Sequence, residues 1–208
     1  MLSDSAMTAA EHMEFLVLAW FILQETGSPF LLGLYGALRY MGTLFSPFYG
    51  IVVDKYDRTR LLEILRATLT GFALLLLLLI PTGLLHVWHI FILVGVAGVA
   101  RGFDSVVRQT LIPDVVPRAG ILNAVALTQT TRSMTQIVGP IAAGLLLTQF
   151  GMSWSYTAIV GLYSIGTITA TRLEARPRVT LTFGAVSVVT DMRRALAYVR
   201  KEEVVLGL

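Results

Sequence analysis

Cysteine is absent from this sequence of 208 residues. That absence excludes disulfide bridges, thiolate metal sites and a cysteine nucleophile, and it leaves the redox compartment open. Charged residues are scarce as well, because Asp, Glu, Lys and Arg make up only 14% of the chain, against roughly 25% in soluble proteins. This number of charges is too small to cover a surface that faces water. We therefore expect part of the surface to face lipid.

Several functional patterns are also missing. The first twelve residues contain Asp4 and Glu11 but neither Lys nor Arg, so they do not read as a cleavable signal peptide. No Gly-Lys-Ser or Gly-Lys-Thr loop occurs, which argues against ATP as an energy source. Gly-x-Ser-x-Gly and His-Glu-x-x-His patterns are absent too. We therefore expect no enzymatic activity, no cofactor and no metal site.

Apolar sequence is what the chain has in abundance, with 55% hydrophobic residues. A membrane-spanning helix needs about 20 mainly apolar residues, and residues 61–80 meet this requirement most clearly. Five more spans are expected at residues 1–23, 30–53, 86–107, 121–149 and 154–171. The sequence thus predicts an all-α integral membrane protein built as a six-helix bundle.

The turns and the charges support six spans. The connections at 26–29, 81–83 and Gly151 contain no Lys or Arg, whereas every connection between them is cationic. Positive residues stay in the cytoplasm, so we expect both termini and the loops 54–60 and 106–120 on the cytoplasmic side of the plasma membrane.

The connection between the second and third spans carries a motif of glycine and charge. Gly50 permits close helix contact, and Asp54 at a helix end can accept bonds from the N–H groups that begin another helix. Lys55 follows directly, and Arg58, one turn after Asp54, can hold its carboxylate. The segment resembles the signature loop of the major facilitator superfamily, which implies a conformational latch. It departs from that pattern at Asp57, which can cap the third helix instead; the alternative is an ordinary solvated loop.

Two later segments strengthen the resemblance. Residues 101–127 are similar to the connection between the fourth and fifth helices in the branch that contains enterobactin and macrolide exporters. The following Gly139, Pro140 and Gly144 are similar to the Gly-Pro motif in the fifth helix of antiporters of this superfamily. Proline removes a backbone hydrogen bond and kinks the helix, while the glycines allow close packing.

Family members have twelve helices in two six-helix halves, with the substrate path between them. The resemblance therefore implies that residues 1–172 are an N-terminal six-helix domain, that 173–203 are a cytoplasmic linker, and that 204–208 begin a seventh helix of a truncated chain. Residues 184–203 have an amphipathic pattern that fits either the cytoplasmic lipid surface or packing against another part of the protein.

The function implied by the resemblance is secondary active transport. We expect proton-coupled efflux of small molecules such as drugs, macrolides or siderophores by alternating access. The expected partners are the lipid bilayer, the small-molecule substrate, protons and a C-terminal six-helix half, and no nucleic acid. The alternatives are a half-transporter that works as a dimer and a non-transporting membrane fragment or scaffold.

Ionisable residues inside the spans are candidates for a proton or substrate path. They are Glu11, Glu14, Arg39, Asp104, Arg108 and Arg132. A carboxylate in a dehydrated cavity can carry a proton, which makes Glu11 or Glu14 the candidate for proton coupling. Arg39 or Arg132 would supply the counter-charge. The alternatives are structural salt bridges or, for Asp104 and Arg108, side chains that reach the membrane interface.

The alternation of cationic and neutral connections predicts which side each one faces. Single cysteines at Thr59, Gly120 and Arg176 should react with a membrane-impermeant thiol reagent only from the cytoplasm, and one at Thr82 only from outside. The sequence has no cysteine of its own, so each variant reports one position. Labelling at Thr82 from the cytoplasm would contradict the six-helix arrangement.

Overall fold

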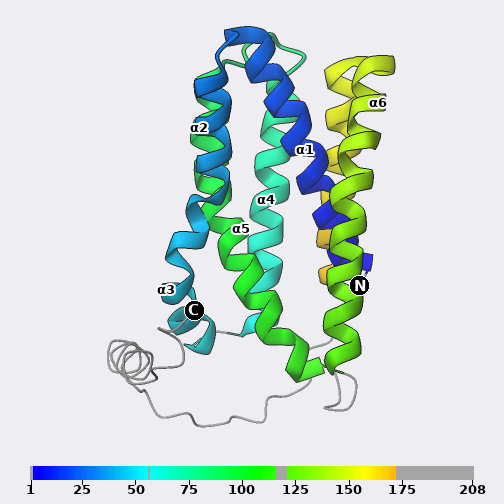
Figure 1. Cartoon of the computed structure of the whole chain (residues 1–208). Helices are drawn as coiled ribbons and strands as arrows, with labels where there is room; N and C mark the ends of the chain where they lie inside the picture. Colours follow the sequence, from blue (N-terminus) through cyan, green and yellow to red (C-terminus); the bar gives the residue numbers. More distant parts are fainter. Residues whose placement is uncertain (1, 56, 116–120, 172–208) are drawn as a thin grey trace, which may run out of the picture. The chain divides into compact units, whose positions relative to one another are not determined.

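The computed structural model describes residues 2–55, 57–115 and 121–171, and every element in these ranges is helical. In chain order the elements are α1 (Leu2–Thr26), α2 (Pro29–Tyr40), the 3-10 helix η1 (Met41–Phe45), α3 (Ser46–Lys55), α4 (Arg58–Leu79), α5 (Val87–Val115) and α6 (Ile121–Ala170) (Figure 1). The all-α prediction is thereby confirmed. The predicted linker 173–203, its amphipathic segment 184–203 and the run 204–208 lie outside the described residues.

Four of the described helices are long and apolar enough to cross a membrane. They are Ser3–Thr26, Arg58–Leu79, Val87–Thr110 and Val125–Ala170. Large apolar side chains remain exposed on the outside of the bundle, among them Phe30, Leu44, Leu78 and Trp154. Since soluble proteins keep such patches small, these helices belong to a multi-pass membrane protein.

The second predicted span, residues 30–53, is not one continuous helix. It is divided into α2, η1 and α3, and the 3-10 segment lies where the backbone passes closest to α5. A tighter 3-10 turn inside a helix typically marks a local constraint. Here the constraint is tertiary, and the local sequence does not reveal it.

The predicted fifth and sixth spans are both contained in α6, which is 50 residues long. Gly151 interrupts it with a left-handed φ of 80° and ψ of −179°, a conformation that glycine adopts without a steric penalty. Both arms of α6 pack on α1 (Figure 1): before Gly151, Gly139 lies near His12, and after it, Gly166 lies near Met7. The predicted turn at Gly151 is therefore present.

Helix starts follow the predicted capping chemistry. The Ser28 hydroxyl accepts a hydrogen bond from the Leu31 N–H (3.4 Å), with Pro29 as the first residue of α2. The Asp57 carboxylate likewise accepts a bond from the Thr59 N–H (2.9 Å) and caps α4. The capping role expected for Asp57 is confirmed.

Packing centres on α1, whose most extensive contact is with α6, while α4 packs on both α5 and α6. Most of the fully buried side chains come from α1, α4, α5 and α6, for example Ile22, Leu76, Ile90 and Ile159, and α2 and α3 add Tyr35 and Val53. The contact of η1 with α5 is made by backbone, through Gly42, Gly98 and Gly102. A Cβ atom on Gly98 would lie 2.6 Å from the Leu38 carbonyl oxygen, and one on Gly102 would lie 2.7 Å from the Gly42 carbonyl carbon.

This close contact predicts that Gly98→Ala destabilises the bundle, because the added methyl group has no space between two backbones. Overpacking of this kind costs about 1–3 kcal/mol, which should lower the melting temperature in detergent, followed by tryptophan fluorescence. Gly71→Ala in α4 is the matched control, since a Cβ there meets no atom within 4 Å and alanine favours the helix by about 1 kcal/mol. Equal melting temperatures for the two variants would contradict the close contact.

Candidate functional site

A carboxylate lies in the middle of the bundle with both of its oxygens engaged. Glu14 of α1 is only 3% exposed. Tyr156 donates to its Oε1 (2.9 Å), Tyr163 donates to its Oε2 (2.8 Å), and the Arg101 guanidinium forms a salt bridge with the same Oε2. We call Glu14, Arg101, Tyr156 and Tyr163 the Glu14 cluster.

Three helices build this cluster. Tyr156 and Tyr163 are seven residues apart, which places them two turns apart on one face of α6, facing α1. Arg101 comes from α5, and its Nη2 also donates to the Tyr163 hydroxyl (3.3 Å). A carboxylate that is paired and fully hydrogen-bonded is tolerated in a low-dielectric interior. Removing its charge would leave the Arg101 guanidinium without its partner.

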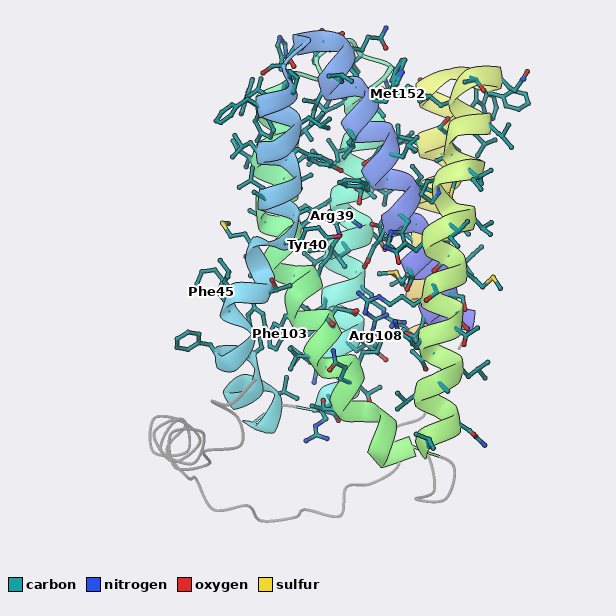
Figure 2. All side chains as sticks on the ribbon, viewed as in Figure 1. Arg39, Tyr40, Phe45, Phe103, Arg108 and Met152 are labelled. Carbon is teal, nitrogen blue, oxygen red and sulfur yellow. The ribbon has the colours of Figure 1, made fainter. Side chains whose placement is uncertain are left out.

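A second arginine contacts α1 about one turn before Glu14. Arg39 of α2 is 7% exposed, and its Nη2 donates to the Glu11 carbonyl oxygen (2.9 Å). Its guanidinium lies 5.1 Å from the centre of the Phe15 ring, on which Tyr35 also stacks with 5.4 Å between the ring centres. Figure 2 shows Arg39 near mid-height of the helices, whereas Arg108 lies towards the end at which α3 and α5 finish.

A second charge cluster occupies that end of the bundle. Arg66 of α4 is fully buried and contacts Ser3 and Asp4 of α1. Its Nε also lies 3.4 Å from Asp104 Oδ1 of α5, and Arg108 Nη2 lies 3.5 Å from the other oxygen of Asp104. We call these five residues the Arg66 cluster; it joins α1, α4 and α5.

Three of the six sequence-predicted candidates, Glu14, Asp104 and Arg108, belong to these clusters. Glu14 is paired with Arg101, and the Arg39 guanidinium reaches the backbone of Glu11. Arg132 is exposed on the first arm of α6. Asp104 and Arg108, predicted from their one-turn spacing, contact each other.

Sequence reasoning did not single out Arg66, Tyr156 or Tyr163. Arg66 lies within 61–80, the span predicted most clearly, and a charge inside such a run is by itself a functional signal. The two tyrosines gave no such signal, because a tyrosine in an apolar helix commonly serves packing. Their role depends on Glu14, more than 140 positions away in the chain.

The latch motif lies where α3 ends and α4 begins. Asp54 and Lys55 are the last two residues of α3, and their side chains lie outside the described part of the chain. Arg58 is the first residue of α4, and its Nη1 donates to the Thr110 carbonyl oxygen of α5 (3.0 Å). Gly50 is half-buried in α3. The arrangement ties α4 to α5 beside the motif.

The Gly-Pro motif lies in the first arm of α6. A Cβ atom on Gly139 would lie 3.1 Å from His12 Cβ, so this glycine permits close contact with α1. Pro140 follows inside the helix, and the residue with non-helical angles inside α6 is Gly151. A Cβ atom on Gly144 would meet no described atom within 4 Å. Gly139 is therefore the member of the motif that packs closely here.

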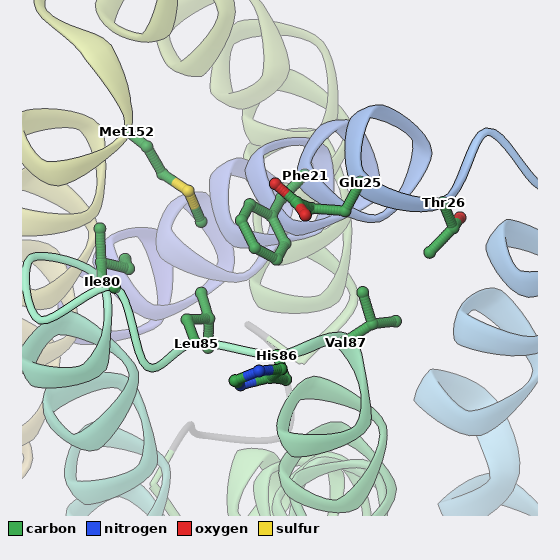
Figure 3. Close-up of a pocket in the computed structure, with 9 residues that line it drawn as sticks. Phe21, Glu25, Thr26, Ile80, Leu85, His86, Val87 and Met152 are labelled. Atoms are coloured by element: carbon green, nitrogen blue, oxygen red, sulfur yellow. The ribbon is translucent and has the colours of Figure 1, made fainter.

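A separate cavity of about 370 Å³ opens near the ends of α1 and α4 (Figure 3). It is lined by Phe21, Glu25, Thr26, Ile80, Gly83, Leu85, His86, Val87 and Met152. Within the described ranges, no group of three side chains could hold a metal ion. The cavity contains no member of either charge cluster.

Comparison with known proteins agrees with these features. The chain is 22% identical over 165 residues to macrolide efflux protein A of Streptococcus pyogenes. The aligned region covers 79% of this chain and 40% of that relative. It is 25% identical over 153 residues to the staphyloferrin A transporter of Staphylococcus aureus, covering 73% of this chain and 38% of the relative. It is 29% identical over 126 residues to the enterobactin exporter EntS of Shigella boydii, covering 57% of this chain and 27% of the relative.

The chain thus spans about 40% of the length of the macrolide efflux protein that it matches. The family model of the Major Facilitator Superfamily, a family of transporters and not of enzymes, matches residues 6–206. The predicted resemblance is confirmed, and this chain belongs to the Major Facilitator Superfamily.

Proposed function

We propose that this chain is the N-terminal six-helix half of a twelve-helix secondary transporter that exports small molecules by alternating access, driven by protons. Family membership and the related staphyloferrin A transporter support transport, and the related macrolide efflux protein and enterobactin exporter support export. In this proposal α2, η1 and α3 form one interrupted span and α6 supplies two spans. The termini lie in the cytoplasm and the protein in the plasma membrane, as the cationic connections predict.

The observation that carries the proposal is the Glu14 cluster. A membrane helix bundle gains little from an isolated buried charge, so a buried carboxylate within a span is a functional hypothesis by default. Glu14 can exist in two states. When ionised, it pairs with Arg101 and holds α1 against α5 and α6; when protonated, it loses the ionic attraction that favours this contact.

These two states give coupling a physical basis. Protonation of Glu14 weakens the contact of α1 with α5, and so favours a different arrangement of the helices. If this rearrangement also changes the side of the membrane from which protons reach Glu14, proton flow would drive movement of the substrate. Arg101 acts in this scheme as a positioning residue for Glu14.

The latch motif completes the proposal. Asp54 and Arg58, at the junction of α3 and α4, would stabilise one of the two conformations, with Gly50 and Lys55 as the remaining members of the motif. The hydrogen bond from Arg58 to Thr110 supports this role, because it connects the junction to the helix that carries Arg101.

Glu14→Gln in the full-length protein should abolish transport against a gradient, since glutamine cannot alternate between charged and neutral states. Downhill exchange of substrate should stay measurable in proteoliposomes. Glu11→Gln is the matched control: this carboxylate lies one turn away on the same helix and is only partly buried, so we expect pumping to persist. Uphill transport with an unchanged pH dependence in both variants and in the double variant would exclude α1 as the proton carrier.

Asp54→Asn should leave the protein in the membrane and reduce its transport rate, because the carboxylate that holds one conformation is lost. Asp57→Asn provides a control three residues away. Asparagine caps a helix about as well as aspartate does, so transport by this variant should stay close to that of the unmodified protein. If Asp54→Asn transports normally at normal expression, Asp54 is a solvated loop charge.

A further inference from the structure

Arg39 differs from the other buried arginines in its partners. Arg66 contacts Asp4 and Asp104, and Arg101 contacts Glu14, whereas no salt bridge joins Arg39 to a carboxylate among the described residues. Its Nη1 is buried without a hydrogen-bond partner in that part of the chain. A buried cation without a counter-ion is costly, so this guanidinium is suited to an anion that the described residues do not supply.

Arg101 offers further donors nearby. It uses Nη2 for Glu14 and Tyr163, while its Nε and Nη1 are buried and have no partner among the described residues. Arg39 reaches α1 at Glu11 and Arg101 reaches it at Glu14. These positions are three residues apart, which is less than one turn of α1 and about 5 Å along the helix axis. The N–H donors without a partner thus belong to arginines of two helices, α2 and α5, and both arginines contact the same turn of α1.

The chemistry of these donors selects the ligand. A guanidinium has five N–H donors and no acceptor, and its planar fork matches a carboxylate. The oxygens of Glu14 are already occupied by Tyr156, Tyr163 and Arg101, so Glu14 leaves the remaining N–H groups free. Beside Arg39, Phe15 is 36% exposed, so part of its apolar surface is accessible.

We propose that Arg39 and Arg101 bind the carboxylate of an organic anion whose apolar or aromatic body packs on Phe15. The inference rests on the proposed transport function and names its substrate class. The substrate uses N–H groups that Glu14 does not use. The substrate site and the proton site therefore adjoin each other. Both include Arg101, but they use different nitrogen atoms of its guanidinium.

The test compares 2-naphthoate with 2-naphthamide, a pair of nearly equal shape that differs in charge. Binding to the full-length protein in detergent is measured by isothermal titration calorimetry. We expect 2-naphthoate to bind at least about tenfold more tightly than 2-naphthamide, which corresponds to about 1.4 kcal/mol. Arg39→Gln should remove most of this preference by weakening 2-naphthoate alone. Arg39→Lys, which keeps the charge and loses the fork, should give an intermediate value.

Arg60→Gln is the control, because it removes an exposed cation of the first turn of α4 and should leave the preference intact. Equal binding of the two probes, or an unchanged preference in Arg39→Gln, would overturn the inference. Should Arg39→Gln fail to fold, the comparison of the two probes on the unmodified protein still decides.

Failure of the inference and failure of the proposed function have different signatures. Gradient-driven transport of erythromycin by proteoliposomes, together with equal binding of the two naphthalene probes, refutes the anion site and leaves the transport function standing. A clear preference for 2-naphthoate that depends on Arg39, without gradient-driven movement of either erythromycin or 2-naphthoate, supports the site and refutes the proposed transport.

Discussion

Charge taken out of water has to be compensated inside this bundle, and the arrangement of the helices follows from how that is done. The effective cost of burying one ion is several kcal/mol. Glu14 meets that cost with two tyrosine hydroxyls and the Arg101 guanidinium, and Arg66 meets it with two carboxylates and the Ser3 hydroxyl. Each buried charge together with its partners joins three different helices, so forming the polar contacts also fixes how those helices pack.

Helix α1 takes part in both sets of contacts and also in that of Arg39. Its first turn meets Arg66, its middle meets Arg39 through the backbone of Glu11, and the next turn meets Arg101 through Glu14. Apolar packing against α6 is extensive, but it does not favour one rotation of α1 as strongly as directional contacts do. The polar partners therefore favour one register of α1, and any movement of this helix in the proposed transport cycle would have to exchange them.

Local chemistry was predictable from the sequence where neighbouring residues decide it. Ser28 with Pro29, Asp57 and Gly151 act at the positions expected of caps and turns. The partner of Glu14 was not predictable in this way, because Arg39, Arg132 and Arg101 are all charges within apolar segments, and spacing along the chain does not choose among them. The break at η1 was equally hidden, since Gly42 stands out only when Gly98 and Gly102 of α5 lie against it.

The contact of η1 with α5 has a mechanical consequence. At Gly42 and Gly98 the two backbones touch directly, so no side chains lie between them that could adjust to a shift. The 3-10 turn of η1 separates two regular helices, α2 and α3. This contact between η1 and α5 is thus a pivot point for α2 and α3. In the proposed transport cycle, α3, which ends in Asp54 and Lys55, would tilt about this contact while α2, which carries Arg39, keeps its place beside α1. Opening one face of the protein in this way would not require Arg39, the proposed substrate contact, to move.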